Sequence, residues 1–318
     1  MYASPVVSSD SAQMRAWLQM HLCVLCWGFT GILGKLITLD ALPLVWQRML
    51  IVAGVLALVP GFWVGLRRMN VRAVVIVAGI GVLLSLHWVT FYLAIRLANA
   101  SVAATCMALT PVVIALVDPL ITRRRFDLRE LLFGLAVIPG VVLVAGGTPV
   151  AMRMGVAVGA LSAVIIGVVS CLNKRFAVSA SALAVTGVEM AAGVLFLPLI
   201  APLLESQPLL VWPGTADLGW LLLLAFGCTL LPFALALVAM RQLSAFGSAL
   251  AVNLEPVYTI VLAMLLFGEQ HELGPGFYAG AAILLAVVFS QPLLMRPRSP
   301  IAAAPTAAEA PPASDQPA

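Results

Sequence analysis

The segment VVIVAGIGVLLSLHWVTFYLAIRL, residues 74–97, decides the fold because it is long and apolar enough to cross a membrane as one helix. Such a helix needs about 20 predominantly apolar residues to span roughly 30 Å of hydrocarbon. The rest of the chain has the same character: 63% of its 318 residues are hydrophobic, only 9% are charged, and its mean hydropathy is +1.11. Soluble domains carry about 25% charged residues. The composition therefore excludes a soluble globular protein and predicts an integral membrane protein.

Ten apolar segments of this kind can be read along the chain. Their apolar runs are continuous and rich in Leu, Ala and Val, whereas the strands of a membrane barrel alternate over about ten residues. The sequence therefore predicts an all-α polytopic membrane bundle with ten transmembrane helices. The predicted helices cover residues 17–38, 42–66, 74–97, 100–122, 130–147, 154–173, 181–203, 217–240, 245–267 and 273–294.

The Lys and Arg residues predict the orientation of these helices, because short cytoplasmic loops carry an excess of both. If the N-terminus is cytoplasmic, most of the 17 basic residues lie on the cytoplasmic side, and the outer connections hold only Arg96 and Arg153. We therefore expect a bacterial-type inner-membrane protein with both termini in the cytoplasm, including residues 1–15 and a disordered Pro/Ala-rich tail at 295–318. The predicted cytoplasmic residues are Arg15, Arg67, Arg68, Arg72, Arg123, Arg124, Arg125, Arg129, Lys174, Arg175, Arg241, Arg296 and Arg298.

An internal repeat divides the chain into two halves, residues 16–148 and 153–294. SVAATCMALTPVV (101–113) resembles FGSALAVNLEPVY (246–258) at an offset of 145 residues, which aligns Pro111 with Pro256. Five helices in each half make the second half enter the membrane from the opposite side, and inverted repeats of this kind are typical of secondary transporters. The alternative is that Leu- and Ala-rich helices align by composition alone. Nearly equal offsets also pair Arg48 with Glu189, Gly28 with Gly167, and Lys35 with Lys174.

Several segments together resemble the EamA family of the drug/metabolite transporter superfamily. They are LCWGFTGILGKLI, LPLVWQRMLI, LHWVTFYLAIRLANASVA, CLNKRF and VNLEPVYTIVLAMLLFGEQ. The resemblance covers about residues 16–294 and includes both repeats. It implies ten helices, a cavity lined by helices 1–4 and 6–9, and peripheral helices 5 and 10. It also implies transport of amino acids, related metabolites or toxic compounds, often as export.

Charged residues inside the predicted helices are the first candidates for function, because burying a charge in a bilayer costs about 2.5–3.5 kcal/mol on insertion scales. Arg48 lies inside the second predicted helix. Its guanidinium could hold a cargo carboxylate with two parallel hydrogen bonds. The alternative is a structural ion pair with Glu189 or Glu255.

Glu255 and His87 are the candidates for carrying a coupling proton. Glu255 lies immediately before Pro256, which removes one backbone donor and opens polar backbone beside the carboxyl group. His87 lies near the centre of the third predicted helix, and an imidazole titrates close to neutral pH. The alternatives are a packing hydrogen bond at a proline kink for Glu255 and a buried packing role for His87.

The predicted substrate-binding set adds polar and aromatic residues to these charges. Helical geometry places Asn253 about 200° around the axis from Glu255, so we expect these two side chains to face different surfaces. Lys35 and Lys174 are expected to extend to the two membrane interfaces, and Asp118 to pair with the nearby Arg123–Arg125 cluster. The glycine pairs Gly61/Gly65, Gly155/Gly159 and Gly276/Gly280 favour close helix packing, with a homodimer as an open alternative. The complete predicted set is Arg48, His87, Glu189, Glu255, Trp27, Trp88, Tyr92 and Asn253.

Two partial matches to enzyme motifs fail. GFTGILGK (28–35) has the wrong spacing for a phosphate-binding loop, and Leu36 stands where such a loop needs Ser or Thr. His271 and Glu272 begin a zinc-protease pattern, but Pro275 occupies the second ligand position. We therefore expect neither an enzyme nor an ATP-driven pump, and no cofactor or metal. A net charge of +4 without a basic stripe also argues against nucleic-acid binding.

The sequence as a whole favours an inner-membrane secondary transporter that works by alternating access. Charges of both signs in one cavity suit an amino-acid-like or zwitterionic cargo, including opine-like metal chelators. The family favours export, and the expected partners are a small-molecule substrate and membrane lipid. The alternatives are an uncoupled facilitator, a translocase of lipid-linked intermediates and, more distantly, an intramembrane enzyme.

Overall fold

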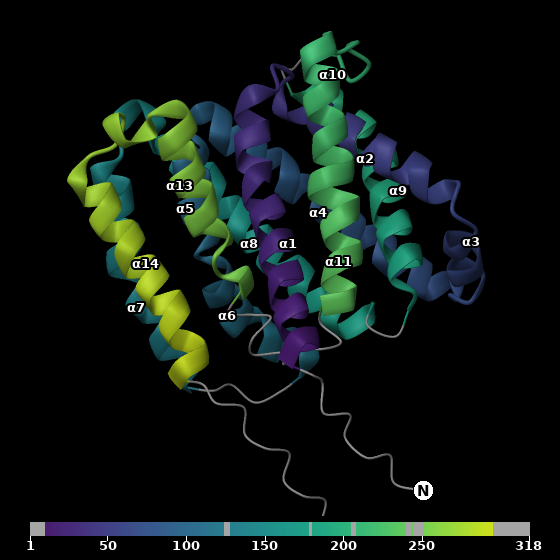
Figure 1. The fold of residues 1–318 in the computed structure, drawn as a ribbon, viewed down its shortest axis with the longest axis horizontal. Coiled ribbons are helices and arrows are strands. Elements are labelled where there is room, and N and C mark those ends of the chain that lie inside the picture. Colours follow the sequence, from purple (N-terminus) through teal and green to yellow (C-terminus); the bar gives the residue numbers. More distant parts are fainter. Residues whose placement is uncertain are drawn as a thin grey trace, which may run out of the picture.

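A computed structural model describes residues 10–123, 128–177, 180–204, 208–239, 243 and 251–294, and no strand occurs among them. Figure 1 shows a bundle of helices with the N-terminal end of α1 at its lower edge. The first half forms α1 (Asp10–Leu36), α2 (Ala41–Ala57), α3 (Pro60–Arg67), α4 (Val71–Leu97), α5 (Ala100–Met107), α6 (Thr110–Thr122) and α7 (Leu128–Gly147). The second half forms α8 (Arg153–Phe176), α9 (Ala182–Ile200), α10 (Thr215–Leu222), the π-helix η3 (Leu223–Leu230), α11 (Leu231–Ala239), α13 (Glu255–Phe267) and α14 (Pro275–Leu294). Short 3-10 turns are η1 (Val150–Met152), η2 (Ala201–Leu203) and η4 (Glu269–His271).

The predicted all-helical membrane class is confirmed. Within the described ranges, five helical segments are long and apolar enough to cross a membrane, and the bent pair α2–α3 would make a sixth. Ten crossings therefore remain a prediction, since the other apolar helices are shorter. The five segments are Gln13–Leu36, Val71–Leu97, Ala100–Thr122, Val150–Phe176 and Ala182–Leu203, and the shorter helices are Ala136–Gly147, Thr215–Leu230, Glu255–Phe267 and Pro275–Val287.

The prediction of one continuous helix over residues 42–66 is wrong. The chain bends by 86° between α2 and α3. Val59 is extended there (φ −87°, ψ 116°), and Pro60 is the first residue of α3. Proline disfavours helical backbone in the residue before it and is well suited to the first position of a new helix. The bend therefore has a local cause that Pro60 supplies.

The segments 100–122 and 245–267 are each interrupted, at equivalent positions of the two halves. Turns separate α5 from α6 at residues 108–109 and precede α13 at residues 253–254. Both α6 and α13 contain 13 residues and have proline at the second position. Both end at a residue with left-handed backbone, Arg123 (φ 57°) and Gly268 (φ 68°). The 145-residue offset of the sequence repeat thus relates two helices of the same length, start and end.

The same kind of helix contact occurs twice between the halves: once from a helix of the first half to one of the second, and once from the second half to the first. A Cβ built on Gly28 of α1 would lie 3.2 Å from the carbonyl oxygen of Glu255 in α13. A Cβ built on Gly167 of α8 would lie 3.5 Å from the carbonyl oxygen of Thr110 in α6. Gly28 pairs with Gly167, and Glu255 with Thr110, in the sequence repeat. The first helix of each half therefore packs on the second part of the fourth segment of the other half.

Helices α7 and α14 lie side by side at one flank of the bundle, which Figure 1 shows at the left. A Cβ built on Gly280 would lie 2.6 Å from the carbonyl oxygen of Gly140, so only glycine fits this contact. The other predicted glycine pairs also face neighbouring helices of the same chain. Gly61 and Gly65 face Leu183 and Ser181, and Gly155 and Gly159 face Ala98 and Cys106. All three pairs serve packing within the chain, and the homodimer stays a prediction.

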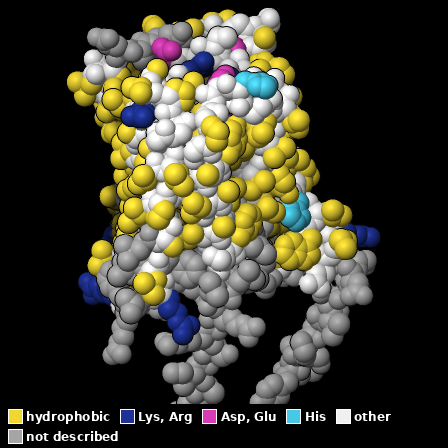
Figure 2. All heavy atoms as spheres, turned by 90° about the vertical axis from the view of Figure 1, so that its left-hand side faces the viewer, with side chains coloured by type: hydrophobic (Ala, Val, Ile, Leu, Met, Phe, Trp, Pro, Cys, Tyr) yellow, Lys and Arg dark blue, Asp and Glu magenta, His cyan; other side chains and the backbone are white. Residues whose placement is uncertain are grey.

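Apolar side chains cover the middle of the face in Figure 2, while charged side chains gather toward its two ends. At the end that contains η4, Lys35 Nζ lies 2.8 Å from Glu269 Oε1. Lys174 Nζ lies 3.1 Å from Asp118 Oδ2, at the C-terminal end of α8. The sequence predicts that Asp118 pairs with the Arg123–Arg125 cluster at the end of its own helix. The structure adds an ion pair between Asp118 and Lys174 of the other half, which the sequence does not predict. The predicted cytoplasmic residues Arg124, Arg125, Arg241, Arg296 and Arg298 and the predicted tail at 295–318 lie outside the described residues.

Candidate functional site

A cavity of about 600 Å³ lies between the two halves. Both interrupted segments reach it, because Thr110 and Pro111 of α6 and Glu255 and Pro256 of α13 belong to its lining. Interrupted helices at matching positions of two repeats are the typical location of transporter binding sites, since they bring backbone polar groups into the membrane interior. The family resemblance implies a lining from helices 1–4 and 6–9, and Leu285 of α14 adds a contribution from the tenth segment.

The structure gathers most of the predicted substrate-binding set around this cavity. All but one of the eight predicted residues line it, and the exception is Tyr92, which lies behind Arg48. Whether these residues bind a cargo stays a prediction. The lining members of the set are Trp27, Arg48, His87, Trp88, Glu189, Asn253 and Glu255.

Arg48 is 3% exposed and is held by hydroxyl groups and an aromatic ring. Its Nε and Nη2 donate to Thr229 Oγ1 at 3.0 and 2.8 Å, and its Nη1 donates to the Tyr92 hydroxyl at 3.0 Å. The guanidinium carbon lies 3.9 Å from the centre of the Trp88 ring. Within the described ranges, none of these contacts is with a carboxylate, so the ion pair with Glu189 or Glu255 is not formed in this structure. Because a guanidinium has five N–H donors, one N–H on each terminal nitrogen remains for another partner.

The π-helix η3 places Thr229, which the sequence analysis missed. Thr229 Oγ1 donates to the carbonyl of Leu224, five residues earlier, at 2.9 Å. Single π-turns within helices are frequent at functional sites, because they shift the direction of the side chains that follow. A threonine in an apolar helix is common, and its contact with Arg48 joins residues far apart in the chain. No pattern in the sequence marked it.

Glu189 lies on α9, is 6% exposed and lines the cavity together with Asn173 of α8. A Cβ built on Gly81 of α4 would lie 2.4 Å from the Glu189 carbonyl oxygen. The close contact of α4 and α9 at this glycine fixes the position of Glu189. Asn173 and Thr186 also line the cavity and were missed. Thr186 could have been found, because it lies one helical turn before Glu189 on the same face.

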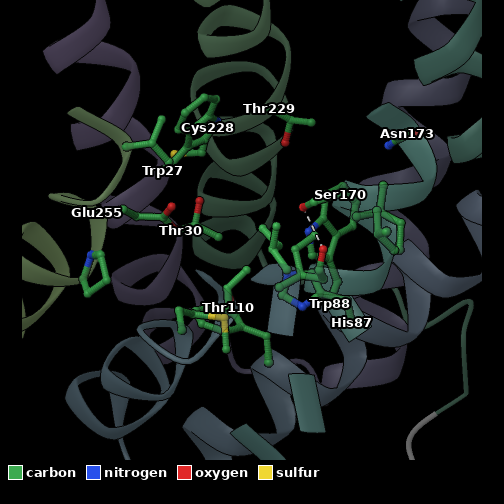
Figure 3. A pocket seen from close by; sticks show the side chains of 18 of the residues that line it. Trp27, Thr30, His87, Trp88, Thr110, Ser170, Asn173, Cys228, Thr229 and Glu255 are labelled. Atoms are coloured by element: carbon green, nitrogen blue, oxygen red, sulfur yellow. Dashed lines mark hydrogen bonds between the residues drawn. The ribbon is translucent and has the colours of Figure 1, made fainter. Parts of the chain in front are cut away.

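Glu255 is the first residue of α13, and Thr259 Oγ1 contacts its carbonyl oxygen at 3.1 Å and that of Gly28 at 2.9 Å. Figure 3 shows Glu255 on the same side of the view as Trp27 and Thr30, with Asn173, Ser170 and His87 on the other side. The expectation that Asn253 and Glu255 face different surfaces is wrong, because both line the cavity. The turn at residues 253–254 ends the helical periodicity on which that expectation depended.

His87 lines the cavity and is also anchored to α8. Its Nδ1 lies 2.8 Å from Ser162 Oγ and 3.0 Å from the Ser162 carbonyl oxygen, and Ser162 Oγ donates to the His87 carbonyl at 2.9 Å. One ring nitrogen therefore serves the packing of α4 on α8. The packing and cavity-lining interpretations of His87 both describe part of this arrangement.

This chain resembles a known protein family in sequence and several solved structures in fold. A family model described as the EamA-like transporter family matches residues 14–146 and 153–291, one match in each half. No curated protein matches the chain. Solved structures do match, and one crystal structure, described only as that of a protein, aligns with a TM-score of 0.56 and 21% sequence identity. The alignment covers 88% of this chain and 98% of that chain, and at this identity it shows the fold alone.

Proposed function

Because this chain belongs to the EamA-like transporter family of the drug/metabolite transporter superfamily, we propose that it is a secondary transporter of amino-acid-like, zwitterionic small molecules. One observation carries the proposal. The buried guanidinium of Arg48 lines the cavity between the halves and, among the described residues, is held by hydroxyl groups without a carboxylate partner. A cation in this setting is available to the carboxylate of a cargo.

The surroundings of Arg48 support carboxylate binding in particular. Tyr92 and Thr229 fix the direction of the guanidinium before a cargo arrives, which lowers the entropic cost of binding. The two remaining N–H groups match the two oxygens of a carboxylate, a geometry that the single charge of lysine cannot reproduce. Arg48 is therefore our first candidate for the residue that orients the cargo.

Carboxyl groups on other parts of the lining support a cargo that also carries a positive charge. Glu189 and Glu255 come from different helices of the second half and line the same cavity as Arg48. A cavity with groups of both signs suits a zwitterion better than a lipophilic drug or a simple anion. Amino-acid derivatives with more than one carboxylate, such as opine-like metal chelators, fall within the proposed class.

Alternating access is the proposed mechanism. The first helix of each half packs on the fourth segment of the other half, at Gly28 and at Gly167, so relative movement of the halves would change both ends of the cavity. We propose export across the inner membrane, which is usual in this family, with both termini in the cytoplasm. Glu255 or His87 is the proposed carrier of a coupling proton.

The test is transport by the purified full-length protein in proteoliposomes, with Arg48→Ala compared with the wild type. We expect at least a tenfold loss of amino-acid flux, because a hydrogen bond to a charged group contributes about 1.5–3 kcal/mol. Arg175→Ala is the matched control, since Arg175 lies at the exposed end of α8 outside the cavity. Equal flux in wild type and Arg48→Ala, with equal insertion, would contradict the proposal.

The same vesicles separate the alternative functions. Accumulation driven by an imposed pH gradient supports proton coupling, and flux that only equalises concentrations identifies an uncoupled facilitator. Saturable movement of a fluorescent lipid-linked sugar without flux of any soluble solute identifies a lipid translocase instead.

A further inference from the structure

Three buried oxygen atoms beside the cavity have no hydrogen-bond partner within the described residues. They are Asn173 Oδ1, Thr186 Oγ1 and Glu189 Oε1, and all three residues belong to the cavity lining. Thr186 is 7% exposed and Glu189 is 6% exposed. More than about 90% of buried polar groups in native proteins are hydrogen-bonded, so a group of unpaired oxygens at a cavity points to a missing donor.

The three residues are held together by helix geometry and packing. Thr186 and Glu189 are three residues apart on α9 and therefore lie on the same face, one turn apart. Asn173 lies on α8, which packs against α4 as α9 does, and it lines the same cavity as Thr186 and Glu189. The absence of a side chain at Gly81 lets α4 pack directly against the Glu189 backbone of α9. Asn173, Thr186 and Glu189 are therefore a preformed part of the cavity lining.

The chemistry of these atoms selects a particular donor. A carboxylate oxygen, an amide oxygen and a hydroxyl oxygen can each accept at least one hydrogen bond, so one donor group with three N–H bonds can satisfy all three. A primary ammonium group offers three N–H donors and a positive charge, which a buried carboxylate needs as a partner. A trimethylammonium group carries the same charge but offers no N–H, so it would leave all three oxygens unpaired.

We propose that Asn173, Thr186 and Glu189 form the subsite that binds the primary ammonium group of the cargo. This inference rests on the proposed function and makes it more specific, because it places the amine at α8 and α9 and the carboxylate at Arg48. The cargo then has one orientation in the cavity. Glu255, which Figure 3 shows on the opposite side of the view from Asn173, is not needed to bind the amine.

The experiment measures uptake into proteoliposomes from a mixture of the proteinogenic amino acids, read by mass spectrometry. Each amino acid that enters is then offered as its N,N,N-trimethyl form and as the acid that lacks the amine. We expect the wild type to transport the trimethyl form at least ~10-fold less well than the parent, because all N–H donors are lost. Equal transport of the two forms would overturn the ammonium subsite.

Variants that remove single oxygens locate the subsite. Thr186→Val, which keeps the shape of the side chain, and Glu189→Gln are expected to lower uptake of the parent amino acid about 5- to 30-fold. Neither should lower uptake of the acid that lacks the amine. Thr148→Val is the control, because Thr148 is buried directly after the end of α7, outside the cavity, and donates to the Val144 carbonyl. Size-exclusion profiles of the purified variants exclude misfolding as the cause.

The outcomes separate this inference from the function on which it rests. Loss of uptake in Arg48→Ala with full uptake in Thr186→Val and Glu189→Gln overturns the subsite and leaves the transporter proposal standing. No amino-acid uptake above empty vesicles by the wild type overturns both. Uptake that stops when sodium is replaced by choline, together with equal handling of parent and trimethyl forms, assigns the three oxygens to a sodium ion and also overturns the subsite.

Discussion

Arg48 shows how single side chains can prepare a charge for a ligand inside a membrane protein. Trp88 lies under the guanidinium, and Tyr92 and Thr229 accept its hydrogen bonds from two directions. Hydroxyl groups orient the charge without neutralising it, whereas a carboxylate would do both. The positive charge therefore remains available at the cavity.

This arrangement predicts coupled effects of Tyr92→Phe and Thr229→Val. Each substitution removes one acceptor of Arg48, and we expect each to lower kcat/KM for an amino-acid cargo about fivefold, since one hydrogen bond contributes about 1 kcal/mol. The double variant should lose less than the product of the two single losses, because both acceptors orient the same group. A double-mutant cycle measured by transport gives the coupling, and fully additive losses would contradict a shared role.

At this scale the sequence indicated the charges but not their partners. Arg48, Glu189 and Glu255 are conspicuous because each interrupts an apolar segment. Thr229 and Asn173 are not, since hydroxyl and amide side chains are frequent in apolar helices and gain meaning only through contacts across the fold. Those contacts depend on how α2, α8 and η3 pack, which no local pattern specifies.

At the scale of secondary structure, the equivalent helices α6 and α13 end in the same backbone conformation with different residues. Gly268 adopts its left-handed conformation freely, whereas Arg123 has a Cβ that disfavours it. A Cβ at Gly268 would approach only His271 Cδ2, at 3.9 Å, so substitution there meets no clash. The left-handed backbone conformation alone therefore determines the free-energy cost of placing a side chain at residue 268.

We predict opposite effects of two substitutions at these helix ends. Gly268→Ala should destabilise the protein by about 1–2 kcal/mol, and Arg123→Gly should be neutral or stabilise it by up to about 1 kcal/mol. Gly54→Ala is the control, because Gly54 lies within α2 with open space around an added Cβ and alanine is the better helix former. Apparent Tm values in detergent check the order, and a lower Tm for Arg123→Gly than for Gly268→Ala would contradict it.

The positions of the helices followed well from apolar runs, while their interruptions did not. Pro60 and Pro256 are visible in the sequence, and each lies next to a break. A proline shows where a helix can end, but the 86° bend between α2 and α3 depends on how α3 packs against α9. The angle is a property of the tertiary structure.

At the scale of the whole molecule, the ion pairs at the two ends of the bundle differ in burial. Glu269 is fully buried, accepts from Lys35 and also accepts from the backbone N–H groups of Ala100 and Ser101 at the start of α5. In the other pair Asp118 is also buried, at 2% exposure, but the side chain of Lys174 is 63% exposed, compared with 30% for Lys35. The pair at η4 is therefore the more buried of the two, and it also joins the first half to the second at the start of α5.

This difference predicts that Glu269→Gln opens the η4 end. Cys228 lines the cavity and can report access after the other cysteines, Cys23, Cys26, Cys106 and Cys171, are replaced. We expect several-fold faster labelling of Cys228 by a membrane-impermeant thiol reagent added from the η4 side, because removing one partner of a buried pair is costly. Lys174→Met, at the opposite end, should not accelerate labelling from that side. Equal labelling in Glu269→Gln and wild type would show that this pair does not close the cavity.

The contacts between the halves also bear on how the protein is made. Arg48, Lys35 and Gly28 are synthesised early, and their partners Thr229, Glu269 and Glu255 are added only after most of the chain has left the ribosome. During that interval the guanidinium lies in a nascent half-bundle without the hydroxyl that later receives it, at an insertion cost of about 2.5–3.5 kcal/mol. During biogenesis the amino-terminal half therefore lacks these contacts until the carboxy-terminal half has been made. A gene split between α7 and α8 would yield a functional protein only when both fragments are produced together.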